Sequence, residues 1–167
     1  MSIQIRELVE SDLTQIVSAF AAINWDKPLS QFQKYLSEQN NATRSVLVAF
    51  EDRQFVGYVT VVWQSEYLAF REENIPEIVD LNVLPAWQRQ GIGSQLMDRA
   101  EKIVSERSNW VGIGVGLAPG YNAAQTMYVS RGYIPDGLGI TYDNKYPEFG
   151  ETVAVDHSLE LHLKKQV

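Results

Sequence analysis

Residues 76–104 read PEIVDLNVLPAWQRQGIGSQLMDRAEKIV and carry the clearest pattern in the chain. Apolar residues over 78–83 predict a strand that Pro85 closes, and residues 91–107 have helical periodicity. Between them lies Gln88-Arg89-Gln90-Gly91-Ile92-Gly93, where the two glycines allow backbone amides to turn outward with no Cβ in the way. Because these N–H groups stand at the positive end of a helix dipole, the junction predicts a phosphate or pyrophosphate site that extends to Ser94.

Two common phosphate motifs are excluded at this junction. No Gly-Lys-Ser/Thr follows the glycines, so the stretch is not a Walker loop. A dinucleotide fingerprint is also excluded, because Gln95 stands where that motif has its third glycine.

The flanking sequence predicts alternating strands and helices. Upstream we expect a strand over 3–9, a helix capped by Ser11 or Asp12, a helix with Pro28 in its first turn, and a hairpin of 45–51 with 54–63 around Asp52-Arg53. Downstream we expect a loop over 65–74, strands over 111–117, 133–142 and 152–163, a helix over 123–131 and a loop over 143–150. This order is typical of a mixed α/β sheet in one domain, residues 1–167.

Composition narrows the class of protein. The 167 residues are 45% apolar and 21% charged, which is typical of a globular chain. The absence of cysteine excludes disulfide scaffolds, thiolate zinc sites and cysteine nucleophiles. The net charge of −7 disfavours nucleic acid as a partner.

The start of the chain and its two histidines exclude further classes. MSIQIRELVESDL is acidic and lacks an apolar core, so we expect no secretory signal. Apolar runs are too short to cross a bilayer, so we expect a cytoplasmic protein with no membrane partner. His157 and His162 have no further ligands at metal spacing, and we expect no metal.

The run Gln88-x-x-Gly91-x-Gly93 resembles the [QR]-x-x-G-x-[GA] pyrophosphate motif of the GNAT superfamily of N-acetyltransferases. A second resemblance lies 40 residues beyond Gln88, where Tyr128 and the pair Gly132-Tyr133 are similar to the superfamily's tyrosine-bearing helix and glycine-aromatic pair. The order of predicted elements is similar to that fold from Ile3 to Leu163.

The resemblance implies a fold and a coenzyme. The fold would be a single GNAT domain with a mixed, mostly antiparallel sheet of roughly seven strands, flanking helices, and the fourth and fifth strands splayed. The co-substrate would be acetyl-coenzyme A, held through Leu81, Val83, Gln88, Arg89, Gln90, Gly91, Ile92, Gly93 and Ser94. The family commonly has asparagine seven residues before its tyrosine; Tyr121 stands there, and Asn122 is expected to contact the pantetheine arm in its place.

The resemblance also implies catalytic roles. Tyr128 occupies the position of the general acid for the departing thiolate, and the Val83 amide that of the donor to the thioester carbonyl. An amine with a pKa of about 10.4 is neutral in roughly one molecule in 2,500 at pH 7, so a base is needed. Ungapped alignment of the glycines places Glu77 at the base position of histone-acetylating members. Asp80 and Asn82 are the alternatives, and a bulge in this strand would alter which side chains share a face.

We therefore expect an N-acetyltransferase whose acceptor, a primary amine, attacks acetyl-coenzyme A directly in a ternary complex. The acceptor would be a small molecule or a peptide, and the acidic chain favours a cationic one. The resemblance also admits a homodimer. Two rival functions are a catalytically silent coenzyme-A-binding sensor or structural module of the same fold, and a nucleotide-binding protein of another fold.

Three glycines of the strand over 111–117 leave two interpretations open. Gly112, Gly114 and Gly116 recur at every second residue and therefore share one face. This face would be either a smooth surface for a packed helix or room beside the coenzyme.

Overall fold

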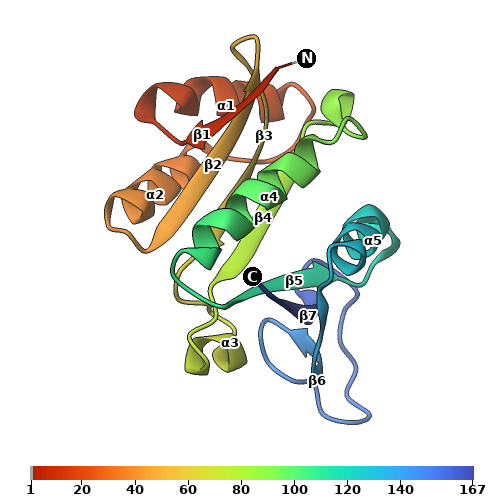
Figure 1. The fold of residues 1–167 in the computed structure, drawn as a ribbon. Helices are drawn as coiled ribbons and strands as arrows, with labels where there is room; N and C mark the ends of the chain where they lie inside the picture. Colours follow the sequence, from red (N-terminus) through yellow and green to blue (C-terminus); the bar gives the residue numbers. More distant parts are fainter. Residues whose placement is uncertain (1) are drawn as a thin grey trace. The chain divides into compact units, whose positions relative to one another are not determined.

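A computed structural model describes residues 2–167, in which seven strands form one mixed sheet of order β1-β2-β3-β4-β5-β7-β6 (Figure 1). The strands are β1 (Ile3–Glu7), β2 (Arg44–Glu51), β3 (Gln54–Val62), β4 (Glu77–Val83), β5 (Trp110–Gly116), β6 (Ile134–Tyr142) and β7 (Leu159–Gln166). The helices are α1 (Leu13–Ala21), α2 (Leu29–Asn40), α3 (Leu68–Glu72), α4 (Ile92–Ser105) and α5 (Asn122–Ser130), with 3₁₀ turns at Glu10–Asp12, Pro85–Trp87 and Pro119–Tyr121. Within the described chain, none of the helices combines the length and the apolar character needed to cross a membrane.

The predicted fold class is confirmed by the pairing of these strands. The pairs β1–β2, β2–β3, β5–β7 and β6–β7 are antiparallel, whereas β4 and β5 are parallel. The parallel ladder of β4 and β5 comprises the pairs Glu77–Gly112 and Ile78–Ile113 among the described residues.

The contacts divide the chain into two compact units. The first comprises residues up to Trp63 together with Val79–Ile103, and the second comprises Gln64–Ile78 together with Val104–Val167. Strand β4 contributes to both units, because its first two residues belong to the second and the others to the first.

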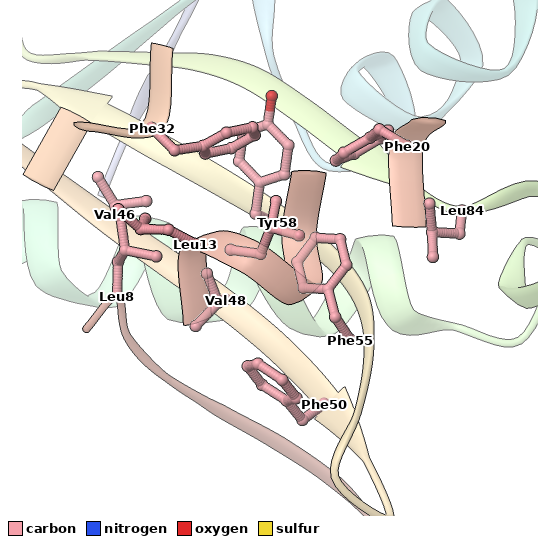
Figure 2. Close-up of a cluster of buried hydrophobic side chains, with 11 residues drawn as sticks. Leu8, Leu13, Phe20, Phe32, Val46, Val48, Phe50, Phe55, Tyr58 and Leu84 are labelled. Carbon is pink, nitrogen blue, oxygen red and sulfur yellow. The ribbon is translucent and has the colours of Figure 1, made fainter. Parts of the chain in front are cut away.

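The first unit has an aromatic core between its strands and the helices α1 and α2 (Figure 2). Helix α1 presents Leu13, Ile16 and Phe20 at the spacing of one helical face, and all three are buried. The ring of Tyr58 from β3 makes edge contacts with Phe20 and with Phe32 of α2, with centroids 5.9 and 5.4 Å apart. Such pairs add specific geometry to the burial of apolar area.

The hairpin of β2 and β3 forms where it was predicted. Glu51 pairs with Gln54, and the two residues between them, Asp52 and Arg53, have φ values of 44° and 69°. Two positive φ values in a two-residue loop are typical of a type I′ turn, whose twist matches that of the strands.

The second unit differs from the sequence predictions in two elements. Helix α3 lies in the segment predicted as a loop, and its Phe70 packs on Gly112, where a Cβ would overlap the ring. The ring of Tyr121 covers Gly116 in the same way, so aromatic rings cover this face of β5 at both ends, and the Glu160 carboxylate lies at Gly114 between them. The last strand begins at Leu159 and not at residue 152, because it is 159–166 that pairs with β5 and β6.

Candidate active site

The junction between β4 and α4 is a loop with two left-handed residues. Arg89 and Gly91 have φ values of 63° and 80°. The side-chain amide of Gln88 donates to the Val83 carbonyl at 2.9 Å, and that of Gln90 donates to the Ala86 carbonyl at 3.2 Å. Both glutamines therefore stabilise the loop through its own backbone.

The first turn of α4 is open to an anion. The N–H groups of Ile92, Gly93 and Ser94 have no acceptor within the helix, because the first intrahelical bond runs from the Gln95 amide to the Gly91 carbonyl at 3.0 Å. No acidic residue stands in this turn. A Cβ at Gly91 would have no neighbour within 4 Å, and one at Gly93 would meet only Val83 Cγ2 at 3.8 Å. These amides, at the positive end of the helix dipole, fit a pyrophosphate.

Close approach of β3 and β4 determines where the middle of β4 lies. The Leu84 amide donates to the Val56 carbonyl at 2.9 Å, and Thr60 Oγ1 donates to the Val79 carbonyl at 3.1 Å. At Gly57 a Cβ would stand 2.6 Å from the Asn82 carbonyl oxygen, so only glycine permits this distance. The neighbouring Tyr58 then reaches β4 with its hydroxyl.

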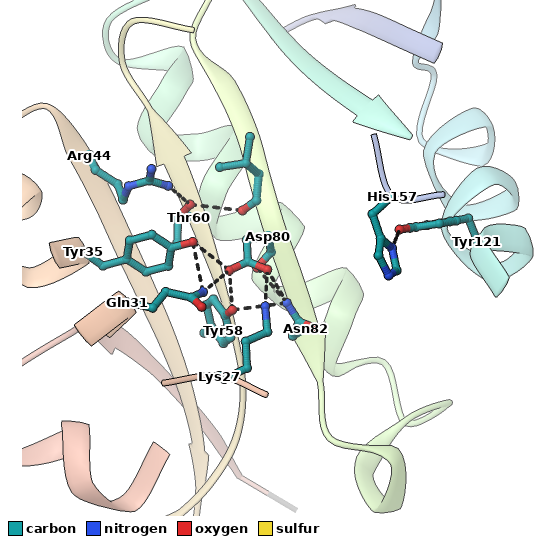
Figure 3. A network of polar contacts seen from close by, with 11 residues as sticks. Lys27, Gln31, Tyr35, Arg44, Tyr58, Thr60, Asp80, Asn82, Tyr121 and His157 are labelled. Carbon is teal, nitrogen blue, oxygen red and sulfur yellow. Dashed lines mark hydrogen bonds and ion pairs between the residues drawn. The ribbon is translucent and has the colours of Figure 1, made fainter. Parts of the chain in front are cut away.

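Asp80 of β4 is the centre of a polar network, which we call the Asp80 cluster (Figure 3). Its carboxylate accepts five hydrogen bonds, one from each surrounding side chain. The donors are Lys27 Nζ at 2.8 Å, Gln31 Nε2 at 3.1 Å, the Tyr35 hydroxyl at 2.9 Å, the Tyr58 hydroxyl, and Asn82 Nδ2 at 2.7 Å. Lys27 also forms an ion pair with Asp80, and each of the two side chains is 20% exposed.

The backbone and the charge of Asp80 are both unusual. Its φ of 58° interrupts the extended conformation of β4, as in a bulge, and is rare for a residue other than glycine. Burial alone would raise the pKa of Asp80, but the Lys27 ammonium and the hydrogen bonds from Lys27, Tyr58 and Tyr35 lower it below its ordinary value. Asp80 is therefore an anion throughout the neutral range.

The pKa of Glu77, at the start of β4, is shifted in the direction opposite to that of Asp80. It is buried and accepts a hydrogen bond from the Ser65 hydroxyl. Burial, assisted by the charges of Glu160 and Glu66, raises the pKa of Glu77 to about 7 although the Ser65 bond lowers it. A carboxyl group with this pKa can accept and release a proton near neutral pH.

His162 of β7 lies beside Glu77 and is neutral. Its Nε2 is 3.9 Å from Glu77 Oε1, has no hydrogen-bond partner in the described chain, and is fully buried. The Tyr67 ring stacks on the imidazole with centroids 3.7 Å apart. Burial lowers the pKa of His162 to about 4.

The predicted acid, Tyr128, lies on α5 with its ring tilted against that of Tyr133 at 5.9 Å. Burial raises the pKa of Tyr128 to about 12, so the hydroxyl is protonated at neutral pH. Asn122 is exposed at the start of α5 and accepts from the Ala123 amide at 2.7 Å, whereas the Tyr121 hydroxyl pairs with His157 Nδ1.

The predicted site residues fall into two groups. Asp80, Leu81, Val83 and residues 88–94 belong to the first unit, and Glu77, Tyr128 and Asn122 to the second. The sequence pattern gives no sign of Lys27, Gln31, Tyr35 and Tyr58 around Asp80, nor of Ser65 and His162 around Glu77. The predicted hairpin was the only available signal for Tyr58, since it makes β3 a neighbour of other strands. Nothing local indicated Lys27, which is 53 residues from Asp80.

Comparisons with known proteins agree with this geometry. The sequence model of the acetyltransferase (GNAT) family matches residues 6–133. No curated protein matches the sequence. The fold is similar to that of an N-acetyltransferase from Staphylococcus aureus Mu50, with a TM-score of 0.71, 17% identity and 99% of each chain covered.

Two further solved structures share the fold. The PaiA N-acetyltransferase of Thermoplasma acidophilum, in complex with coenzyme A, has a TM-score of 0.68 and 18% identity, with 100% of each chain covered. The ribosomal-protein-alanine N-acetyltransferase of Brucella melitensis has a TM-score of 0.71 and 22% identity, with 98% of this chain and 99% of that chain covered. The chain belongs to the GNAT acetyltransferase family, and it is an acyltransferase.

Proposed function

We propose that this protein transfers an acetyl group from acetyl-coenzyme A to a primary amine, which attacks the donor directly in a ternary complex. The observation that carries the proposal is the loop 88–94, where left-handed Arg89 and Gly91 lead into a helix start with open glycine positions. We also propose that residues 1–167 act as one domain, because the family match and the similar structures span both units.

The coenzyme would be held mainly by backbone groups. The amides at the start of α4 would bind the pyrophosphate, with Gln88, Arg89 and Gln90 forming the loop around it. Leu81 and Val83 would pair with the pantetheine arm, and Asn122 would contact it. Bound acetyl-coenzyme A supplies an activated acyl group as a thioester. The Val83 amide would donate to the charge that develops on the acyl oxygen.

Tyr128 is proposed as the general acid. Its raised pKa keeps the hydroxyl protonated at neutral pH, so the proton is present when the thiolate departs. The proton moves from the Tyr128 hydroxyl to the sulfur as the carbon–sulfur bond breaks.

Glu77 is proposed as the base, directly or through water, and Asp80 as the alternative. Their pKa shifts favour Glu77, because a base works best with a pKa near the working pH. Asp80 has a lowered pKa and five donors on its carboxylate, so it binds positive charge better than it accepts a proton.

The acceptor is proposed to be a small cationic amine, with a peptide amine as the second class. A thiol-release assay with acetyl-coenzyme A and a panel of amines and peptides tests the function. Release that requires an acceptor supports the proposal. Tight coenzyme binding without release from any amine would favour a silent binding module, and preference for ATP or NAD would contradict the coenzyme assignment. A homodimer and a cytoplasmic location stay predictions.

A further inference from the structure

We propose that the Asp80 cluster is a binding subsite for a primary ammonium group of the acceptor, which Lys27 fills in the acceptor-free protein. The inference rests on the proposed function, because it assumes an amine acceptor. It assigns Asp80 to ammonium binding and leaves the proton transfer to another group.

The donors around Asp80 define the chemistry of the ligand. Four of the five are neutral side-chain amides and hydroxyls that hold the carboxylate in place. The fifth, Lys27 Nζ, is itself a primary ammonium group on a flexible four-carbon stem, bound at Oδ1. Without Lys27 the Asp80 carboxylate would lose the charge of the ammonium and one donor at Oδ1, while four neutral donors would still stabilise its negative charge. An alkylammonium ion supplies both the missing charge and the missing donor.

An aromatic face adds to this preference. Lys27 Nζ lies 5.7 Å from the centroid of the Tyr58 ring, within the range of a cation–π interaction. An ammonium ion that replaced Lys27 would meet the same ring, whereas a neutral alcohol would gain neither this attraction nor the ion pair.

Lys27 is placed so that it can leave. It lies in the segment between the end of α1 at Ala21 and the start of α2 at Leu29, outside both helices. Both members of the ion pair are 20% exposed, so solvent reaches them. Release of the lysine therefore requires no break in a helix or strand. Replacement of one ammonium by another also preserves the charge balance around Asp80.

The conformation of Asp80 supports a role in binding. A left-handed φ at a non-glycine strand residue is unfavourable and persists only where its surroundings maintain it. Four neutral partners from α2, β3 and β4 maintain it here, independently of Lys27. The carboxylate is thus oriented before the acceptor binds, which lowers the cost of binding.

Titration with n-butylammonium chloride, in the absence of coenzyme and at constant ionic strength, tests the subsite. The amide NMR signals of Tyr58 and Asn82 report binding. We expect Lys27→Met to bind the ion at least about tenfold more tightly than the wild type, because an intramolecular competitor is removed. Lys34→Met is the matched control, since this exposed lysine of α2 pairs with Glu38 and not with Asp80. It should bind as weakly as the wild type.

Two further arms establish specificity. Lys27→Met combined with Asp80→Asn should lose saturable binding, and 1-butanol should not bind to Lys27→Met. If the double variant does not fold, the comparison with 1-butanol still decides. Equal affinity of the wild type and Lys27→Met, or no saturable shift in Lys27→Met, would overturn the subsite.

The butylammonium titration and the thiol-release assay can fail independently of each other. If Lys27→Met binds butylammonium but the wild-type protein releases no thiol with any amine, the proposed function is rejected and the ammonium subsite is upheld. Thiol release with no butylammonium binding would uphold the function and place the acceptor elsewhere.

Discussion

Two carboxylates on β4, three residues apart, have pKa shifts of opposite sign. Glu77 is buried near the charges of Glu160 and Glu66, with the Ser65 hydroxyl as a hydrogen-bond donor, and its pKa rises to about 7. Asp80 meets a cation and four neutral donors, and its pKa falls. Environments that push the pKa values of two carboxyl groups apart give the two groups different roles in enzymes. Substitutions at Glu77 and at Asp80 are therefore expected to have different kinetic effects.

The hydroxyl of Tyr128 is the first test. Tyr128→Phe keeps the ring that contacts Tyr133 and removes the proton. We expect kcat to fall about 10²-fold with unchanged coenzyme affinity, the scale of one general acid. The loss should shrink for an acyl donor whose thiol has a lower pKa. Tyr133→Phe is the control and should stay near wild-type rate. A wild-type rate in Tyr128→Phe would make Tyr128 a packing residue.

The pKa of Glu77 predicts a pH profile. The wild-type kcat/KM should fall on the acid side with an apparent pKa near 7, and Glu77→Gln should lower it about 10²-fold at pH 7. The variant should recover partly at high pH, where more of the amine is neutral. Asp80→Asn should raise the KM for the acceptor, and its rate should show no such recovery at high pH. The reverse pattern would move the base to Asp80, and small equal effects would indicate deprotonation by water.

The sequence could predict these residues only in part. Resemblance to a family indicated Glu77 through the spacing of the glycines and Tyr128 through the second motif, with Asp80 as the alternative base on the same predicted strand. The φ of Asp80 could not be predicted, because a left-handed aspartate leaves no trace in the pattern of apolar residues. Its contact with Lys27 depends on a loop conformation that no local rule fixes.

Elements were predictable where local rules dominate. The hairpin at Asp52-Arg53 and the helix after Gly91 follow from alternation and from turn position. Helix α3 was missed because five residues are too few to show periodicity, and its stability comes from Phe70 on Gly112, a contact across 42 positions. The sequence predicts that the last strand begins at residue 152, seven residues too early. The reason is that Val153 and Val155 alternate as in a strand, although they have no partner strand in the described chain.

The start of α4 gives a prediction in which folding and binding change in opposite directions. Gly93→Asp adds a carboxylate near the positive end of the helix dipole, at a position with room for a Cβ. We expect the free energy of unfolding to rise by about 0.3–1 kcal/mol. Acetyl-coenzyme A affinity, measured by calorimetry, should fall at least about 10²-fold, because the carboxylate would repel the pyrophosphate.

The control for this variant carries the same charge in the same turn. Gln95→Asp adds an acid one position after Ser94, at an exposed residue. The affinity of Gln95→Asp for acetyl-coenzyme A should fall far less than that of Gly93→Asp. Unchanged affinity in folded Gly93→Asp would exclude the α4 start as the phosphate site.

At the scale of the whole molecule, Glu77 and His162 act on stability in opposite directions. The folded pKa of Glu77 lies above its ordinary 4.5, so its contribution is full below pH 4.5 and is lost as pH rises through about 7. The folded pKa of His162 lies below 6.5, so stability is lost as pH falls from 6.5 through about 4. Each of these pKa changes corresponds to a difference in the free energy of unfolding on the order of 3 kcal/mol.

Between pH 4.5 and 6.5 these two slopes, each about 1.4 kcal/mol per pH unit, should nearly cancel in the wild type. Glu77→Gln removes one slope, so its stability relative to the wild type should rise with pH up to about 7. His162→Gln removes the other, so its relative stability should fall as pH rises toward 6.5, whatever constant cost the lost packing adds. Urea unfolding at pH 5.0, 6.0 and 7.0 measures both differences. Because each difference refers to the wild type at the same pH, the titration of groups distant from the substituted side chain cancels. Parallel curves for the three proteins would mean that neither group changes its pKa on folding.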